Sequence, residues 1–400
     1  MQKNIWITFI SMALLNSLVA GDWSNFRGPE YNGIAKEPKL KLDFRAAKPI
    51  RLWKSSVNIG FSSMTTSKGR LFTMGHKGGK DTVYCLDMRN GKELWSMSYR
   101  AKIQPNLYEG GPNSTPTIFD GRVYILGKQG QFYCLSEKSG KKLWSVDISK
   151  DYNYKKPSWG FTGSPYIDGG LVIVNAGSAG IAFNRKTGKL VWKSRQGKAS
   201  YATPVPYNLG TKKAILYFAA SSLICLNPQT GKQYWNVAWK TAHDINGADP
   251  VVYGKDIMIS SGYGRGAALV KASTTSAKIV WETKVMRNQF NSSVLMGDYA
   301  YGIDGNTGNG DTNLRCIRVK DGKLMWSEEI GFASLTGVNN KLLVLRENGQ
   351  LISVDASPKG YKNNGKVQIL SKKCWTSPIV SNGLLFARNA KGDLVCLKLK

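Results

Sequence analysis

Short apolar runs separated by turn residues extend along the chain after its first 20 residues. Typical runs are RLFTMG from Arg70, RVYILG from Arg122 and LVIVNAG from Leu171, and Gly, Asn or Asp stands at their ends. Runs of this kind, bounded by turn residues, predict β-strands. Apolar positions at helical spacing are scarce beyond residue 20. The pattern therefore predicts an all-β protein.

Tryptophans recur along the chain at intervals of 42 to 49 residues. Five of them close an eleven-residue phrase that contains a small residue, a polar turn residue, a glycine and the Trp. The phrases are CLDMRNGKELW (Cys85 to Trp95), CLSEKSGKKLW (Cys134 to Trp144), AFNRKTGKLVW (Ala182 to Trp192), CLNPQTGKQYW (Cys225 to Trp235) and CIRVKDGKLMW (Cys316 to Trp326). A period of roughly 40 to 50 residues is typical of a propeller blade. We expect Trp53, Trp95, Trp144, Trp192, Trp235, Trp281 and Trp326 to dock each blade on its neighbour.

A second pattern, of small residues, a turn and a hydrophobic strand, occurs eight times. The copies begin at Ser62, Ser114, Gly163, Ala202, Ala248, Ser292, Ala333 and Thr376. The eighth copy ends at Lys400 without an outer strand, whereas RLWKSS around Trp53 has a Trp but no preceding blade. We therefore predict an eight-bladed β-propeller of four-stranded antiparallel blades. The N-terminal strand would complete the last sheet and close the ring, which removes exposed sheet edges.

The N-terminus has the features of a secretory signal peptide. Lys3 precedes an apolar run from Ile5 to Leu15, and the small residues Ala20 and Gly21 offer a cleavage site. We predict a signal peptide over 1–21, an extension over 22–48 that packs on the propeller, and the propeller over 49–400. The mature chain has no other apolar run long enough to span a bilayer. We expect a secreted or periplasmic monomer.

The eleven-residue phrase resembles the tryptophan-docking motif of pyrroloquinoline-quinone dehydrogenases and their non-catalytic relatives. Those relatives include the propeller lipoprotein of the outer-membrane β-barrel assembly machinery. WSNFRGPEYNGIA, from Trp23, together with the eight units resembles the secreted quinone-like-repeat propellers of planctomycetes and related bacteria. The catalytic members carry two adjacent cysteines over the quinone, and members with a haem domain carry CxxCH. Neither motif occurs in this chain, so the resemblance implies the fold more strongly than the cofactor.

The cysteines and histidines do not suggest a metal site. Five of the six cysteines occupy one repeated strand position, and equivalent positions of adjacent sheets lie about 10 Å apart, too far for a disulfide. His76 and His243 have no Cys or carboxylate at ligand spacing. DGNTGNGD, from Asp304, partly resembles a calcium loop, but Arg315 stands where the closing Glu is required. We interpret this stretch as a glycine-rich hairpin and predict no bound metal.

The formal charge of the chain is +30 at pH 7. A surface of this charge attracts polyanions. The lysines are spread over many turns, however, and form no dense basic run, so a solvated surface is the simpler interpretation. Partners consistent with these features are other proteins or an anionic polysaccharide, and we expect no nucleic acid.

A small-molecule site in a propeller would lie at the mouth of the central channel, where loops of several blades meet. Polar and aromatic residues of those loops are the candidate ligand-binding residues. They are Glu109, Trp159, Tyr201, His243, Asn246, Arg265, Asn306, Arg346 and Trp375. This mixture suits a sugar or a planar ligand. We predict no catalytic residue.

Two functions from different classes follow. The first is an exported binding or scaffold protein without a cofactor, with a polysaccharide or a protein complex as its partner. The alternative is a quinone-dependent alcohol or sugar dehydrogenase, which requires pyrroloquinoline quinone and calcium held by carboxylate and amide groups beside a catalytic Asp in the channel. The missing cysteine pair and the missing metal cluster favour the first.

Overall fold

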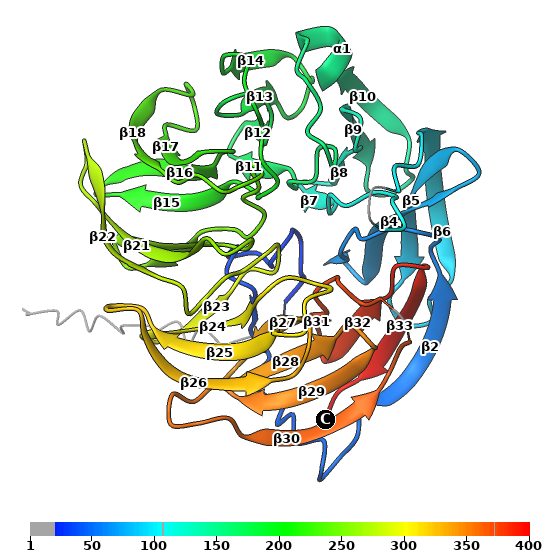
Figure 1. The fold of residues 1–400 in the computed structure, drawn as a ribbon. Coiled ribbons are helices and arrows are strands. Elements are labelled where there is room, and N and C mark those ends of the chain that lie inside the picture. The colour runs from blue at the N-terminus through cyan, green and yellow to red at the C-terminus, as the bar shows by residue number, and fades with distance from the viewer. Residues whose placement is uncertain (1–20, 106–107, 372) are drawn as a thin grey trace, which may run out of the picture.

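The computed structural model describes residues 21–105, 108–371 and 373–400. They form eight β-sheets arranged around a central axis, as Figure 1 shows. The repeat therefore led to the correct fold, an all-β propeller with eight blades. Almost all of the predicted signal peptide lies outside the described residues.

Each blade has four antiparallel strands that follow one another from the channel to the outside of the ring. Blades 1 to 4 consist of β3 (Thr65–Ser67), β4 (Arg70–Lys77), β5 (Lys80–Asp87) and β6 (Glu93–Arg100); β7 (Thr117–Phe119), β8 (Arg122–Leu126), β9 (Gln131–Ser136) and β10 (Lys142–Asp147); β11 (Tyr166–Asp168), β12 (Leu171–Val174), β13 (Ile181–Asn184) and β14 (Leu190–Lys193); β15 (Val205–Leu209), β16 (Lys212–Phe218), β17 (Ser222–Leu226) and β18 (Gln233–Ala238). A short helix, α1 (Ile148–Tyr152), lies between blades 2 and 3.

Blades 5 to 8 repeat this order, and the last one takes its outer strand from the start of the chain. They consist of β19 (Val251–Tyr253), β20 (Asp256–Ser261), β21 (Gly266–Ala272) and β22 (Ala277–Thr283); β23 (Val294–Met296), β24 (Tyr299–Asp304), β25 (Asn313–Arg318) and β26 (Lys323–Glu329); β27 (Ala333–Val338), β28 (Lys341–Arg346), β29 (Gln350–Asp355) and β30 (Asn363–Gln368); β31 (Ile379–Ser381), β32 (Leu384–Arg388), β33 (Asp393–Lys398) and β2 (Ile50–Ser56). A two-residue strand, β1 (Ile34–Ala35), pairs in parallel with β27.

The ring closes in blade 8, where the first long strand meets the last. Strand β2 pairs antiparallel with β33, and Trp53 lies opposite Cys396. The predicted closure by the N-terminal strand is therefore confirmed.

The apolar core is divided into separate clusters that lie between neighbouring blades. One cluster joins Val83 of blade 1 with Ile125 of blade 2, and another joins Leu223 of blade 4 with Ile259 of blade 5. The cluster at the closure combines blades 7, 8 and 1 with Trp23 of the N-terminal extension. Burial of apolar surface therefore holds each blade to the next, as repeat architectures require.

Six of the seven recurring Trp residues donate a hydrogen bond from the indole Nε1 to a backbone carbonyl of the next blade. The acceptors are Met88 O for Trp53 (2.9 Å), Glu137 O for Trp95 (3.0 Å), Arg185 O for Trp144 (3.1 Å), Pro228 O for Trp192 (2.8 Å), Val319 O for Trp281 (3.1 Å) and Ser357 O for Trp326 (2.7 Å). The ring of Trp144 also lies on Gly188, where an added Cβ would stand 2.8 Å from the indole. Gly188 has a φ of +73°. The glycine of the phrase therefore serves both a left-handed turn and a close aromatic contact.

Trp235 is the exception among the docking residues. It is buried, but its Nε1 has no hydrogen-bond partner in the described part of the chain. The next blade has the turn Ser273–Ser276 in place of the glycine turn, and Ala277 starts its outer strand. The indole of Trp235 therefore docks by apolar packing alone.

All six cysteines are buried free thiols. Cys85, Cys134, Cys225, Cys316 and Cys396 lie on third strands, each directly opposite a docking Trp of the same blade. Burial raises the pKa of Cys85 to about 12. These thiols therefore act as small core residues, not as reactive groups.

The N-terminal extension crosses the centre of the ring, where Figure 1 shows the dark blue start of the chain. Trp23 N donates to the Thr66 side-chain Oγ1 of blade 1 (2.8 Å), and Trp23 O accepts a bond from Thr66 N (2.8 Å). Ser24 O accepts a bond from Ile118 N of blade 2 (2.8 Å). Gly33 O accepts a bond from Gly337 N of blade 7 (2.8 Å). The extension thus pairs with the free inner edges of three innermost strands. It occupies one end of the channel.

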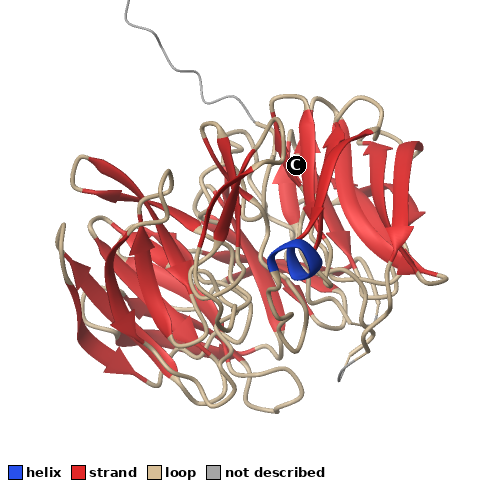
Figure 2. Ribbon diagram, turned by 90° about the horizontal axis from the view of Figure 1, so that it is seen from above, coloured by secondary structure: helices blue, strands red, loops and turns tan. Residues whose placement is uncertain are grey.

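The closed end of the channel is the face that carries the turns between first and second strands. Asp22 accepts a bond from Lys68 N in such a turn of blade 1 (2.8 Å), and Glu37 accepts one from Gly383 N in that of blade 8 (3.1 Å). The first strand of a blade runs towards this closed face and the fourth strand runs away from it, because consecutive strands are antiparallel. The loop that leads from the fourth strand to the next blade therefore lies on the opposite face. Figure 2 shows the loops gathered at the two faces of the ring. The channel is therefore a cup that opens towards the inter-blade loops.

Candidate functional site

The cup has a volume of about 490 Å3 and is lined by residues of all eight blades and of the extension. Its mouth is formed by inter-blade loops, its waist by the residues just before the innermost strands, and its floor by Trp23, Phe26, Arg27 and Gly33 of the extension. A concave site built from many segments, with apolar walls and a few polar groups, is typical of small-molecule binding.

A belt of small polar residues forms the waist of the cup. The equivalent position holds Ser63, Thr115, Ser164, Thr203, Asp249, Ser292, Ser334 and Ser377 in blades 1 to 8. From blade 1 to blade 6, the backbone N–H of each member donates to the side chain of the next, at 2.8 to 3.0 Å. These bonds tie the innermost strands together around the axis. Belt residues line the cavity in six of the eight blades: Ser63, Ser164, Thr203, Asp249, Ser292 and Ser377.

Asp249 is the one carboxylate of the belt. Its Oδ1 accepts the N–H of Thr203 at 2.8 Å, and its own N–H donates to Ser292 Oγ at 2.8 Å. Burial raises the pKa of Asp249 to about 6, and the positive charge of Arg27 acts in the opposite direction. The waist thus carries a group that changes charge close to neutral pH.

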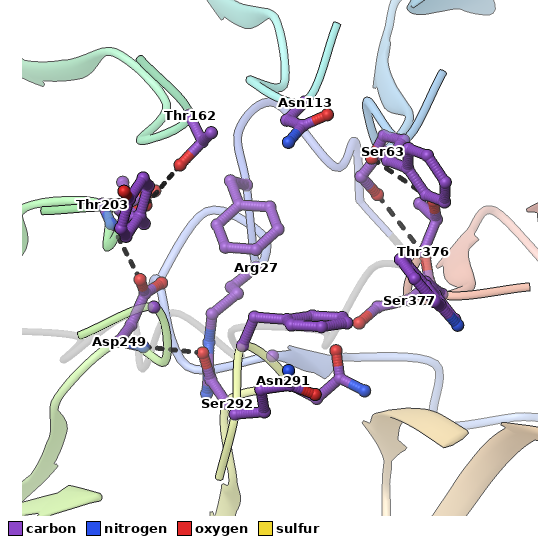
Figure 3. A pocket seen from close by; sticks show the side chains of 18 of the residues that line it. Arg27, Ser63, Asn113, Thr162, Thr203, Asp249, Asn291, Ser292, Thr376 and Ser377 are labelled. Atoms are coloured by element: carbon purple, nitrogen blue, oxygen red, sulfur yellow. Dashed lines mark hydrogen bonds between the residues drawn. The ribbon is translucent and has the colours of Figure 1, made fainter. Parts of the chain in front are cut away.

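Arg27 is the corresponding cation at the floor. Its Nη2 donates to Asn32 O (2.9 Å) and to Ser293 O (2.7 Å), while its Nε is buried without a hydrogen-bond partner among the described residues. Burial lowers the pKa of Arg27, and Asp249 partly offsets that effect. Within the described ranges, no carboxylate lies within 4.0 Å of this guanidinium. Figure 3 shows Arg27 in the middle of the belt, with Asp249 and Ser292 beside it.

Aromatic rings form one wall of the mouth. Trp375 is stacked on Phe61 with ring centroids 5.2 Å apart, and it lies 5.5 Å from Phe290. Tyr108 lies 5.3 Å from Phe61. On another side, Trp159 meets Tyr201 edge to face at 5.9 Å. The cup therefore offers aromatic faces from several blades to a ligand.

Tyr108 is hydrogen-bonded to one of a group of buried polar side chains from blades 1 and 2. The Tyr108 hydroxyl accepts a hydrogen bond from Lys128 Nζ, and burial lowers the pKa of Lys128 to about 8. Close by, His76 Nδ1 lies 2.7 Å from Asp81 Oδ1, and the Tyr99 hydroxyl donates to Asp81 Oδ2 at 3.3 Å. These groups fix the wall of the cup between blades 1 and 2.

Amide side chains supply polar groups around the rest of the cup. Asn113, Asn291, Asn306 and Gln289 line it. Gln289 Oε1 accepts the N–H of Thr307 at 2.8 Å, so its side chain is held in place. Amides both donate and accept hydrogen bonds, which suits ligands rich in hydroxyl groups.

Four of the nine predicted site residues lie in the cup: Trp159, Tyr201, Asn306 and Trp375. Two others lie just outside it. Glu109 forms an ion pair with Lys373 (3.2 Å), and His243 meets Tyr263 edge to face at 5.5 Å.

The remaining three predicted site residues have structural contacts. Asn246 is fully buried, and its Nδ2 donates to Ala219 O at 2.7 Å. Arg265 lies over the ring of Trp239 at 3.4 Å and pairs with Glu282 at 2.7 Å. Arg346 donates to Gln350 at 3.1 Å. The structure does not bring these three into the cup.

Sequence reasoning missed the two charged groups of the cup, Arg27 and Asp249. A signal for Asp249 exists: in STP, GSP, ATP and TSP of other blades a hydroxyl residue precedes the proline, whereas ADP has Asp249 there. Arg27 lies outside the repeat, and only the path of the extension through the channel brings it to the floor.

The residues of the cup do not fit calcium with pyrroloquinoline quinone. Asp249 is the one carboxylate among the lining residues, and the cation of Arg27 acts on it. No group of three or more His, Cys, Asp or Glu is placed to hold a metal ion within residues 21–105, 108–371 and 373–400. Asp304, at the start of the calcium-like stretch, forms ion pairs with Arg287 (2.6 Å) and Arg315 (2.9 Å).

The eight blades, seven of which carry a docking Trp, and the repeated phrase define a β-propeller of the pyrroloquinoline-quinone-like repeat class. The sequence profile of the family described as outer membrane protein assembly factor BamB matches residues 50–146 and 79–328. The chain belongs to this family. It is 22% identical over 299 residues to outer membrane protein assembly factor BamB of Moranella endobia (strain PCIT), a match that covers 70% of this chain and 74% of that protein.

Solved structures share the fold at low sequence identity. BamB from Moraxella catarrhalis is 15% identical with a TM-score of 0.66, covering 88% of this chain and all of that one. The quinohemoprotein alcohol dehydrogenase from Comamonas testosteroni is 12% identical with a TM-score of 0.71, covering 94% of this chain and 80% of that one. At these identities the similarity extends to the fold alone.

Helix α1 has five residues. In the part of the chain that the structure describes, no helix is long and apolar enough to cross a membrane.

Proposed function

We propose that this protein is an exported, non-catalytic binding propeller whose cup holds a carbohydrate and whose outer surface is free to act as a scaffold for protein partners. The observation that carries the proposal is the cup itself, which is sealed at one end by the chain's own extension and lined from eight blades by aromatic, amide and hydroxyl groups. The signal-like N-terminus supports export, and the relative named as an assembly factor supports a scaffold.

The chemistry of the walls suits a sugar. The C–H faces of a sugar ring pack on aromatic faces such as Trp375 and Phe61, which removes apolar surface from water. Its hydroxyl groups exchange hydrogen bonds with amides such as Asn306 and with hydroxyls such as Ser63. Because these groups come from different blades of a rigid ring, little conformational entropy is lost on binding.

The first test is calorimetric titration of the purified protein with a panel of oligosaccharides. We expect at least one to bind, and Trp375→Ala to weaken that binding by roughly tenfold, since aromatic contacts of this kind contribute on the order of 1 kcal/mol or more. Phe119→Ala is the matched control, because Phe119 is an exposed aromatic residue outside the cup. Absence of binding across the panel, or equal effects of the two substitutions, would contradict the proposal.

The second test addresses the quinone-dependent alternative, which the likeness to an alcohol dehydrogenase raises. We expect no dye-linked oxidation of alcohols or sugars after incubation with calcium and pyrroloquinoline quinone, because Asp249 is the one carboxylate among the lining residues and the cation of Arg27 acts on it. A quinone dehydrogenase of known activity serves as the assay control. Turnover that depends on added quinone would refute the non-catalytic proposal.

A further inference from the structure

The deepest part of the cup carries an arginine that forms no ion pair within 4.0 Å among the described residues, although the charge of Asp249 acts on it from a greater distance. Arg27 is about nine-tenths buried, its Nη2 is fixed by two backbone carbonyls, and its Nε has no partner in the described chain. A desolvated guanidinium without an ion pair costs free energy, which an anion that reaches it can recover. Arginine binds carboxylates through paired N–H groups, so its preferred ligand is planar and anionic.

The loops around the mouth are also positively charged. Several cations on the inter-blade loops take part in no ion pair within the described residues: Lys102, Lys155, Lys156, Arg195 and Lys240. Two acids of the same loops, Glu109 and Asp244, are already paired with Lys373 and Lys198. Positive charge around a cavity raises the local concentration of an anionic ligand.

We propose that the cup selects an acidic sugar, a uronate, whose carboxylate lies beside Arg27 at the floor. The proposal rests on the proposed carbohydrate-binding function and deepens it. Aromatic faces at the mouth receive the sugar rings, the hydroxyl belt meets the ring hydroxyls, and the guanidinium meets the carboxylate. A neutral sugar would bring no opposite charge to the guanidinium of Arg27.

Asp249 makes this binding depend on pH. The charged group that acts on it is Arg27, since its neighbours on the adjoining innermost strands, Thr203 and Ser292, are uncharged. The raised pKa of Asp249, about 6, means that it is ionised at pH 8 and largely neutral at pH 5. A uronate carboxylate stays ionised over this range. Affinity should therefore rise as pH falls from 8 to 5, because the repulsion between two carboxylates disappears.

Trigalacturonate and its fully methyl-esterified form are the probes for the role of Arg27, titrated calorimetrically in 0.5 M NaCl to suppress surface adsorption. We expect the acid to bind at least tenfold more tightly than the ester. Arg27→Gln should remove this preference, a loss of roughly tenfold to hundredfold for the acid, and leave the ester unchanged. Arg27→Lys, which keeps the charge but not the fork of donors, should retain part of it. Unchanged binding of the ester would show that the cup of the Arg27→Gln protein is intact.

The matched control is Lys155→Gln combined with Lys156→Gln, which removes two charges near the mouth. We expect it to weaken binding of the acid at 0.05 M NaCl and to have no effect at 0.5 M, since exposed charges are screened. Asp249→Ser restores the hydroxyl found in the other blades. It should raise affinity for the acid roughly tenfold at pH 8 and abolish the pH dependence.

Three outcomes separate this proposal from the function on which it rests. Equal binding of acid and ester, or of the acid to wild type and Arg27→Gln, would overturn the uronate assignment and leave carbohydrate binding in place. Binding of the acid that disappears in 0.5 M NaCl and depends only on Lys155 and Lys156 would show surface adsorption, and it too would overturn the assignment. Absence of binding by the acid, the ester and the wider panel would refute both proposals.

Discussion

Replacement of Arg388 by methionine is expected to lower the free energy of unfolding by about 3 kcal/mol. Arg388 is fully buried in blade 8, and it donates from Nη1 to Met74 O (2.6 Å) and Thr73 Oγ1 (3.0 Å) and from Nη2 to Asn58 O (3.0 Å). These acceptors belong to blade 1 and to the segment before it. Methionine fills part of the space but leaves buried acceptors without a donor, each of which costs about 1–3 kcal/mol.

The charge of Arg388 opposes part of this stabilisation, because burial lowers its pKa to about 9. We expect the lost hydrogen bonds to outweigh the relief from burying a cation, since the ring closes at this contact. The measurement is denaturant unfolding followed by tryptophan fluorescence. Arg70→Met is the control: Arg70 donates to Glu137 O (2.8 Å) from a partly exposed position, so its loss should cost less than about 1 kcal/mol. Equal effects of both substitutions would refute a special role for Arg388.

Trp144→Ala is expected to destabilise the protein by about 3 kcal/mol, below the value for a fully buried tryptophan. The ring lies 5.3 Å from Phe132, covers Gly188 of the next blade and donates to Arg185 O. It is also partly exposed, so some apolar contact is absent. The same unfolding experiment measures the loss.

Leu143→Ala is the matched control for Trp144. Leu143 precedes Trp144 on β10 and is 44% exposed, so its truncation should change stability by no more than about 0.5 kcal/mol. A loss below about 1 kcal/mol for Trp144→Ala would mean that the docking indoles contribute little and that the cores between blades hold the ring.

The fold was predictable because the repeat encodes it directly. The phrases that end at Trp144 and at Trp326 predict the same local structure, in which a glycine turn joins the third strand of a blade to the outer strand that carries the Trp. Closure could be inferred because Trp53 stood without a blade and the last blade without an outer strand. Blades with a weak phrase still formed, since the glycine turn is replaceable, as the turn before Ala277 illustrates.

The candidate site was only partly predictable, for a geometric reason. Residues of the inter-blade loops are close to the mouth, but the sequence does not give the direction of each side chain. Trp159 and Trp375 enter the cup, whereas Arg265, from a turn on the same face, lies over Trp239. Arg27 could not be found because its position depends on the path of a segment outside the repeat.

The pairing of β2 with β33 also determines the order in which the chain can complete its fold. Because the chain is synthesised from its N-terminus, β2 is made first, but the partner of β2 ends at Lys398. Seven blades can therefore form while β2 still has an unpaired edge. The pairing of β2 with β33, which joins residues far apart in the sequence, is expected to form last. A chain that ends before Asp393 would lack β33, so the ring would stay open and β2 and β32 would each expose an unpaired strand edge. We therefore expect that pairing of β33 with β2 removes the exposed strand edges through which an incompletely folded chain could aggregate.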